Sequence, residues 1–290
     1  MMSLILTILF TSLILVQFKL YPKYGINTFQ SIVFNYVTAF TCGFLFFGDG
    51  WIPGAASHGN WPVLAIVCGI LFISVFLLMG LSSQRNGVAM TSVAVKMSMA
   101  LTLLFMIKFY DEPLSVLKIV GILFAFFGVF LMAYEKKESS NAKSHTWMLA
   151  IIFVGSAFLD VILNYFQKTE LSNISNPLFC AIGFGISGII GILVLVIKIA
   201  AGKEKFEVKN VFSGVLLGVP NFFSIYFLLD AYKTCNWSDS TVLSIMNVSI
   251  VIISALIGFL AFKENATKQK IGGLIASVLA IVMLYVATLK

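Results

Sequence analysis

Two charged residues stand inside apolar stretches that are long enough to cross a lipid bilayer. Lys96 lies near the middle of the stretch Val88–Phe109, and Asp160 lies within the stretch Trp147–Phe166. A charge at such depth costs about 2.5 to 3.5 kcal/mol on insertion scales, so it normally faces a partner, a cavity or a substrate. A buried lysine can bind a carboxylate or a phosphate, and an aspartate that gains and loses a proton can couple solute movement to protons.

The same two residues could instead form a permanent structural ion pair, because each charge would hold the other in its ionised form. Substitution separates the two interpretations. A structural pair predicts that either substitution impairs insertion and stability. A functional pair predicts that transport alone is lost.

Polar residues near these charges recur at helical spacing. Ser156, Asp160, Asn164 and Gln167 fall on one face of a helix, which should turn towards the interior of a bundle. Weaker stripes elsewhere could equally hold helices together through hydrogen bonds. The residues expected to contact a small polar solute are Lys96, Asp160, Asn164, Ser92, Asn35, Asn221, Tyr226, Asn247 and Gln17, with Asp160 also expected to carry a coupling proton.

The elements that must position these residues are membrane-spanning helices. Of the 290 residues 60% are hydrophobic and 11% are charged, whereas soluble domains carry about 25% charged residues. Backbone polar groups in lipid must be satisfied within each segment, so the spans should be helical. With about 20 residues per crossing, ten spans are expected, at Met2–Phe18, Phe29–Phe47, Trp61–Leu81, Val88–Phe109, Leu114–Tyr134, Trp147–Phe166, Leu178–Ile199, Val211–Tyr232, Ser240–Phe262 and Ile271–Leu289.

Three spans carry further signals in their small residues and prolines. Pro220 falls inside the eighth span beside Gly218 and Asn221, which predicts either a break that exposes backbone carbonyls to a cavity or a plain kink. The fifth and tenth spans have small residues every three or four positions and should pack against each other. These residues are Gly121, Ala125 and Gly128 in one span, and Gly272, Ala276 and Ala280 in the other.

The chain divides into two halves that match in sequence. We expect a first five-helix unit at residues 1–134, a polar connection at 135–146 and a second five-helix unit at 147–290. Lys19 matches Lys168 and Gly121 matches Gly273 at nearly constant offsets. Because five is odd, the second unit must cross the membrane in the opposite sense, which is typical of alternating-access carriers.

The composition also indicates which cofactors and binding partners to expect. Four single cysteines and two histidines form no metal or disulfide pattern. No cofactor and no nucleic-acid partner are expected, and the partners are a small-molecule substrate and membrane lipid, with a homodimer left open. Thirteen of the nineteen Lys and Arg residues fall in the odd-numbered connections, so the positive-inside rule would place both termini outside.

The whole chain resembles the EamA-type members of the drug/metabolite transporter superfamily. The resemblance rests on the ten spans in two halves, on a glutamate before the last span of each half (Glu112, Glu264), and on the glycines that follow it (Gly121, Gly272, Gly273). It implies a multi-pass protein of the inner (cell) membrane that moves amino acids or related small polar metabolites by alternating access, with proton-coupled export as one form. It also implies that both termini lie in the cytoplasm, against the charge count.

Alternatives to this function stay open. Related phosphate and nucleotide-sugar carriers hold anions with lysines on the fourth and ninth helices. Lys96 matches the first of these lysines, but Val248 stands at its repeat partner. An exchanger of organic anions or phosphorylated metabolites is therefore one alternative, and a non-transporting scaffold or a channel is another. An enzyme is not expected, because no nucleophile is accompanied by a base.

Overall fold

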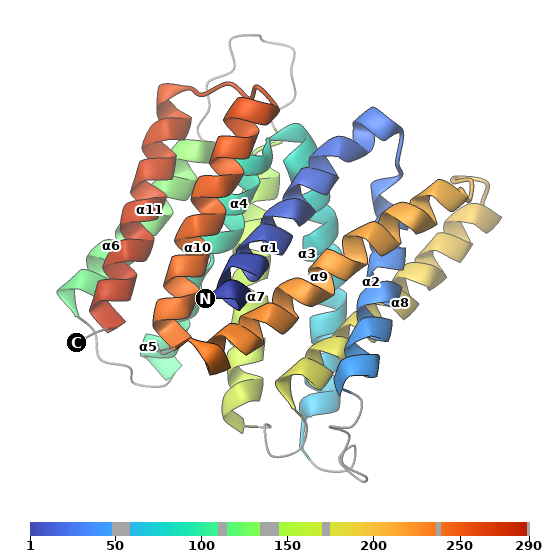
Figure 1. The fold of residues 1–290 in the computed structure, drawn as a ribbon, viewed down its shortest axis with the longest axis horizontal. Helices are drawn as coiled ribbons and strands as arrows, with labels where there is room; N and C mark the ends of the chain where they lie inside the picture. Colours follow the sequence, from blue (N-terminus) through green and yellow to red (C-terminus); the bar gives the residue numbers. More distant parts are fainter. Residues whose placement is uncertain (48–58, 110–114, 134–144, 170–174, 236–238, 289–290) are drawn as a thin grey trace.

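A computed structural model shows the chain as a bundle of helices (Figure 1). It describes residues 1–47, 59–109, 115–133, 145–169, 175–235 and 239–288, and none of these is in a strand. The helices are α1 (Met2–Leu20), a short 3-10 turn η1 (Tyr21–Tyr24), α2 (Thr28–Phe47), α3 (Trp61–Arg85), α4 (Val88–Met97), α5 (Met99–Phe109), α6 (Val116–Ala133), α7 (Trp147–Thr169), α8 (Asn176–Ala200), α9 (Val208–Thr234), α10 (Asp239–Leu256), the π-helical turn η4 (Ile257–Ala261) and α11 (Lys268–Thr288).

The expected ten spans are confirmed. Nine helical segments of the described residues are long and apolar enough to cross a membrane, with α4 and α5 counted together as Val88–Phe109. The tenth span, α6, is a shorter apolar helix. The chain is therefore an all-helical, integral multi-pass membrane protein, which in a bacterium lies in the inner membrane.

Two spans differ from their expected course. The fourth span, predicted as one helix, is divided at Ser98 into α4 and α5. The eighth span, where Pro220 predicted a break or a kink, is one continuous helix, α9, with Pro220 inside it. Ser98 keeps right-handed helical dihedral angles (φ −52°, ψ −28°), so α4 and α5 form one span with a local irregularity beside Lys96, and α9 has no break.

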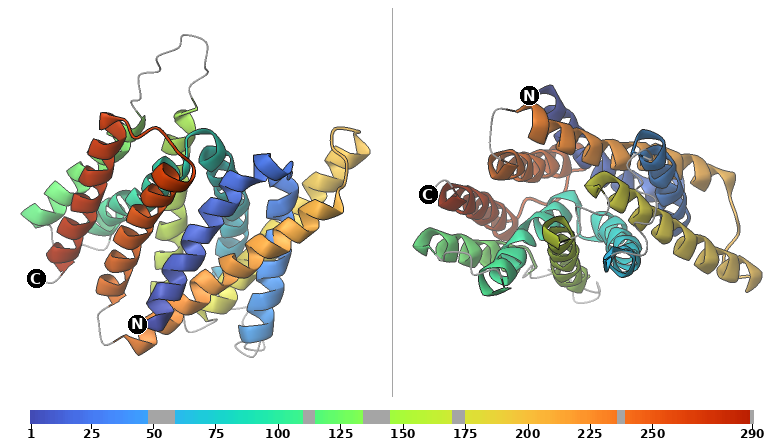
Figure 2. Two further views of the ribbon diagram at one scale, coloured as in Figure 1. Left: turned by 45° about the horizontal axis from the view of Figure 1, so that its top comes forward. Right: turned by 90° about the horizontal axis from the view of Figure 1, so that it is seen from below.

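Helices α6 and α11 lie side by side at one edge of the bundle, with α8 at the opposite edge (Figure 2). A Cβ atom at Gly121 would lie 2.8 Å from the Leu284 side chain, and one at Gly273 would lie 2.9 Å from the Gly128 carbonyl oxygen. The two backbones approach this closely only because these positions lack side chains. The predicted packing of the fifth span on the tenth is confirmed.

The remaining packing pairs helices of the first five spans with helices of the last five. Helix α2 packs on α9 as α8 packs on α3, and α1 packs on α9 as α7 packs on α3. Matching helices also run in opposite directions: α1 rises in Figure 1 where α7 descends, and α6 rises where α11 descends. Two related, inverted halves would produce this pairing. The boundaries of the two five-helix units, at residues 1–134 and 147–290, remain a prediction. Most of the polar connection between them, residues 135–146, lies outside the described residues.

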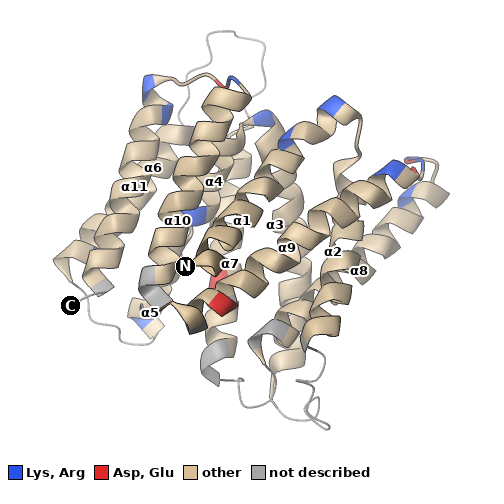
Figure 3. Cartoon of the chain, viewed as in Figure 1, with Lys and Arg blue, Asp and Glu red and all other residues tan. Residues whose placement is uncertain are grey.

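Charged residues are unevenly distributed over the bundle. Figure 3 shows most of the Lys and Arg residues of the described part at its upper end, with few charges along the helices. Large aliphatic and aromatic side chains cover the outside, including Leu45, Val116 and Leu260, each more than 70% exposed. An apolar belt below a basic rim is the surface expected of a membrane protein.

Candidate functional site

The interruption at Ser98 lies two residues after Lys96. The Ser98 hydroxyl donates hydrogen bonds to the Val95 carbonyl (2.6 Å) and to Oδ2 of Asp160 (3.2 Å). The Ser98 carbonyl accepts the N–H groups of both Leu101 (3.0 Å) and Thr102 (3.2 Å). A serine hydroxyl that competes for backbone groups weakens a helix locally. Because Ser98 keeps helical dihedral angles and its carbonyl has two partners, the interruption is a local irregularity of the helix, and its polar contribution is the Ser98 hydroxyl directed at Asp160.

Asp160 is exposed on the inward side of α7. The outward side is marked by Ile151, Val154 and Phe158, which are 47%, 44% and 58% exposed. At 3.6 residues per turn, Asp160 lies about 200° around the helix from Phe158. The Asp160 carboxylate therefore lies on the side of α7 that faces α4 and α5 and does not face lipid.

Lys96 and Asp160 attract each other without direct contact. Their charges interact across the space between α4 and α7, but no ion pair between them is formed in the described part of the chain. Lys96 is half-buried. A permanent structural bridge would bring its ammonium onto the carboxylate, so the geometry leaves both groups able to contact a solute.

Three other predicted residues surround this pair. The Asn247 amide of α10 lies 3.8 Å from the Met99 sulfur, at the start of α5. Asn164 lies one turn beyond Asp160, and its buried Oδ1 has no hydrogen-bond partner. Ser92 lies one turn before Lys96 and donates to the Ala89 carbonyl (2.9 Å). The structure therefore gathers residues of α4, α7 and α10 around the interruption.

Gln17 lies elsewhere, on the seam between α1 and α9. Its Nε2 donates a hydrogen bond to the Leu216 carbonyl (3.1 Å). Leu216 is four residues before Pro220, which has no N–H group, so the normal helical partner of that carbonyl is missing. Gln17 supplies the missing donor, which explains how α9 continues through Pro220.

Asn35 and Asn221 join α2 to α9. Nδ2 of Asn221 donates to Oδ1 of Asn35 (3.2 Å), and both residues are buried. Beside them a Cβ at Gly218 would lie 2.7 Å from the Asn35 carbonyl oxygen, so the two helices are in close contact. Tyr226 lies farther along α9 and packs against Phe46, among other aromatic rings. These three predicted residues lie on seams of α9, apart from the interruption at Ser98.

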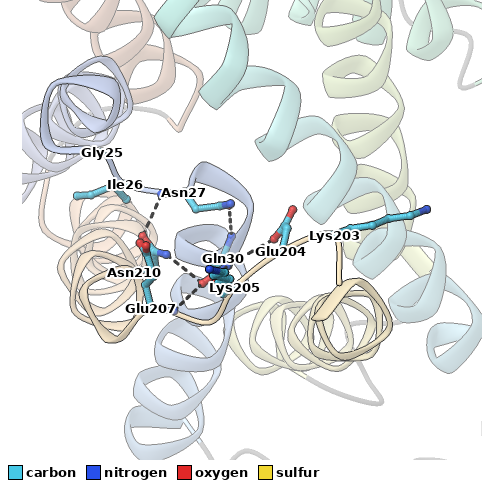
Figure 4. Close-up of a pocket in the computed structure, with 9 residues that line it drawn as sticks. All are labelled: Gly25, Ile26, Asn27, Gln30, Lys203, Glu204, Lys205, Glu207 and Asn210. Carbon is cyan, nitrogen blue, oxygen red and sulfur yellow. Dashed lines mark hydrogen bonds between the residues drawn. The ribbon is translucent and has the colours of Figure 1, made fainter. Parts of the chain in front are cut away.

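A polar pocket of about 390 Å³ lies where α2 begins (Figure 4). Its lining consists of Gly25, Ile26, Asn27, Gln30, Lys203, Glu204, Lys205, Glu207 and Asn210. Gln30 donates to the Lys205 carbonyl (2.8 Å) and accepts from Asn210 (2.9 Å). Glu204 and Glu207 are each paired with a lysine. Because the chain satisfies these groups itself, the pocket ties the α8–α9 connection to α2 and is separate from the Lys96 region.

Sequence reasoning missed Ser98 and the interruption that it makes. A signal was present, because Ser98 is a polar residue two positions after Lys96, the lysine near the middle of its apolar span. Serine and threonine are common in membrane helices, however, and nothing in their spacing distinguishes a hydroxyl that interrupts a helix from one that does not.

Comparison with known proteins agrees with this architecture. The model of the EamA-like transporter family matches residues 2–134, and that of the sugar transport protein family matches residues 97–289. An uncharacterized protein of Haemophilus influenzae is 28% identical to the chain over 98% of both lengths. The chain is a membrane transporter that belongs to the sugar transport protein family, whose model matches more than half of its residues, and its first half matches the EamA-like transporter family, in agreement with the EamA-type resemblance predicted from the sequence.

Proposed function

We propose that the chain is a secondary carrier that moves a small polar metabolite by alternating access. The observation that carries this proposal is the pair of separated charges within the bundle, Lys96 in the fourth span and an exposed Asp160 on the inward side of α7 that accepts a hydrogen bond from Ser98. Charges at this depth are costly in lipid, and carriers use them to bind solutes.

The separated cation and anion favour a zwitterionic substrate such as an amino acid. A solute carboxylate can contact Lys96 while a solute ammonium contacts Asp160, so each charge that was taken out of water regains a partner. Asn164 and Asn247 add amide donors and acceptors beside the pair, and Oδ1 of Asn164 is buried without a partner in the described residues. An incoming N–H or O–H group would satisfy it.

A sugar is the second candidate, favoured by the match to the sugar transport protein family. The hydroxyl groups of a sugar can bond to the same two amides and to a carboxylate. A phosphorylated solute fits less well, because Lys96 is the single cation of the group and Asp160 would repel the phosphate.

Asp160 is also our candidate for proton coupling. Its carboxylate is exposed to the interior, faces a cation and accepts a hydrogen bond from Ser98. A carboxylate that exchanges Lys96, a solute and a proton as partners can link the three events.

Flux into proteoliposomes tests the proposal. A panel of radiolabelled amino acids, sugars and organic acids is offered to the reconstituted protein, with and without an imposed pH gradient. Saturable flux of an amino acid that responds to the gradient supports the first candidate, and saturable sugar flux supports the second. Flux of none of these solutes, with the protein correctly folded, contradicts the carrier function.

A further inference from the structure

Glu264 joins three helices at the end of the bundle that carries most of the basic residues. Its side chain is 9% exposed, and its Oε1 accepts the Val88 N–H (2.9 Å) at the first residue of α4. Lys19 Nζ, at the end of α1, lies 3.1 Å from the same oxygen and 3.5 Å from the Gln84 carbonyl at the end of α3. One carboxylate from the α10–α11 connection thus joins α4 to Lys19 of α1, and Lys19 extends the contact to α3.

The surroundings of Glu264 admit this carboxylate and little else. A Cβ atom at Gly87 would lie 2.5 Å from its Oε2, and one at Gly258 would lie 2.7 Å from the same oxygen. Gly87 also has a φ angle of +106°, which other residues rarely adopt. A negative charge at the first turn of α4 is favoured further by the exposed N–H groups of a helix start.

The packing of the two halves differs at this end. Helix α1 packs against α3 and α4, whereas the matching helix α7 has no comparable packing on α9 or α10 in the described part of the bundle. The group around Glu264 therefore lies at the end where the helices have closed on one another.

We propose that Glu264 is a positioning residue for transport and that, with Lys19, it forms a latch that closes this end of the carrier. The latch must open before the region of Lys96 can reach this side of the membrane. The proposal rests on the proposed carrier function, because alternating access requires each end to open in turn. From Val88 to Lys96 helix α4 rises about 12 Å, so release of its first turn changes the position of Lys96.

The sequence repeats the pair of residue types. Lys168 and Glu112 match Lys19 and Glu264 in the other half, although the structure describes neither side chain.

A thiol-accessibility experiment tests the latch without any substrate. Ser92→Cys serves as the reporter, one turn from Lys96, in a background that lacks the four native cysteines. A membrane-impermeant thiol reagent is applied from the Glu264 side. Glu264→Gln keeps an oxygen for Val88 but loses the charge, so labelling should become about tenfold faster, the population change that about 1.4 kcal/mol produces.

Two further variants complete the experiment. Lys19→Gln removes only the ion pair and should also speed labelling, and it carries the test if Glu264→Gln does not fold. Glu207→Gln is the matched control, because it removes an exposed ion pair of similar length, with Lys209 at 3.0 Å, at the same end. It should leave labelling at the wild-type rate.

The outcomes separate the latch from the transport function. Faster labelling in Glu264→Gln and Lys19→Gln alone supports the latch, even if the wild type moves none of the tested solutes and the proposed function fails. Unchanged labelling in these variants, or an equal increase in Glu207→Gln, overturns the latch even if wild-type flux is normal.

Discussion

The hydrogen bond between Gln17 and α9 can be tested through the proline that makes it necessary. Pro220 lacks the N–H that would bond to the Leu216 carbonyl, and Nε2 of Gln17 lies 3.1 Å from that oxygen. Gln17→Leu removes the donor and retains an apolar side chain of similar length. The Leu216 carbonyl then loses this bond, which lies at an exposed position on the seam between α1 and α9.

The expected cost follows from that loss. Measured side-chain hydrogen bonds in membrane proteins average about 0.6 and reach about 1.7 kcal/mol. We therefore expect Gln17→Leu to lower the free energy of unfolding by about 0.6 to 1.5 kcal/mol. In a Pro220→Ala background the alanine N–H bonds to Leu216, so the same substitution should cost less than about 0.5 kcal/mol.

Reversible unfolding in mixed detergent micelles measures all four proteins of this double-mutant cycle. Gln84→Leu is the matched control. It removes a glutamine hydrogen bond to Thr28 Oγ1 (2.7 Å) that lies away from Pro220, so its cost should be the same in both backgrounds. An equal cost of Gln17→Leu with and without Pro220 would refute the explanation of Gln17 as the replacement donor.

Other contacts give predictions of the same kind. Gly218→Val places a side chain against the Asn35 carbonyl, 2.7 Å from the new Cβ, and should lower the free energy of unfolding by about 1 to 3 kcal/mol. Ala200→Val, at an exposed helical position, is the control, because Gly202 has a positive φ that would itself penalise a valine. Equal losses of stability in the two variants would contradict close packing at Gly218. Ser98→Ala removes the bonds to Val95 and Asp160. Ser98→Ala should reduce flux about tenfold while changing the free energy of unfolding by less than about 1 kcal/mol. The control Ser74→Ala removes a hydrogen bond to the Ile70 carbonyl on an exposed helix face and should leave flux unchanged. Equal flux in both serine variants would show that Ser98 has no part in transport.

The spans could be predicted from the sequence because lipid imposes a length and a polarity on each of them. The packing of α6 on α11 was predictable for a similar reason, since small residues at helical spacing permit close contact wherever they occur. The course of α4 and α9 was harder to predict. Pro220 marks a missing N–H, but whether α9 breaks depends on a donor from α1, more than 200 residues away.

The candidate site was predicted in part. Lys96 and Asp160 could be singled out because charges in lipid are costly, and Asn247 and Asn164 because of their helical spacing. The sequence did not separate these residues from Gln17, Asn35 and Asn221, which are equally polar and equally deep in the chain's spans. Their position distinguishes them, because Gln17, Asn35 and Asn221 lie on the seams of α9 whereas Asn247 contacts Met99 beside Ser98, and that placement depends on tertiary packing.

Flux through the reconstituted carrier, compared with its stability, tests the role of Lys96 and Asp160 most directly. Asp160→Asn preserves an acceptor for Ser98, and Lys96→Met preserves the length of the side chain without its charge. We predict that both variants insert and unfold within about 1 kcal/mol of the wild type, that flux falls at least tenfold in each, and that flux in Asp160→Asn no longer responds to a pH gradient. Wild-type flux in either variant, or loss of stability that accounts for the lost flux, would contradict a transport site at this pair.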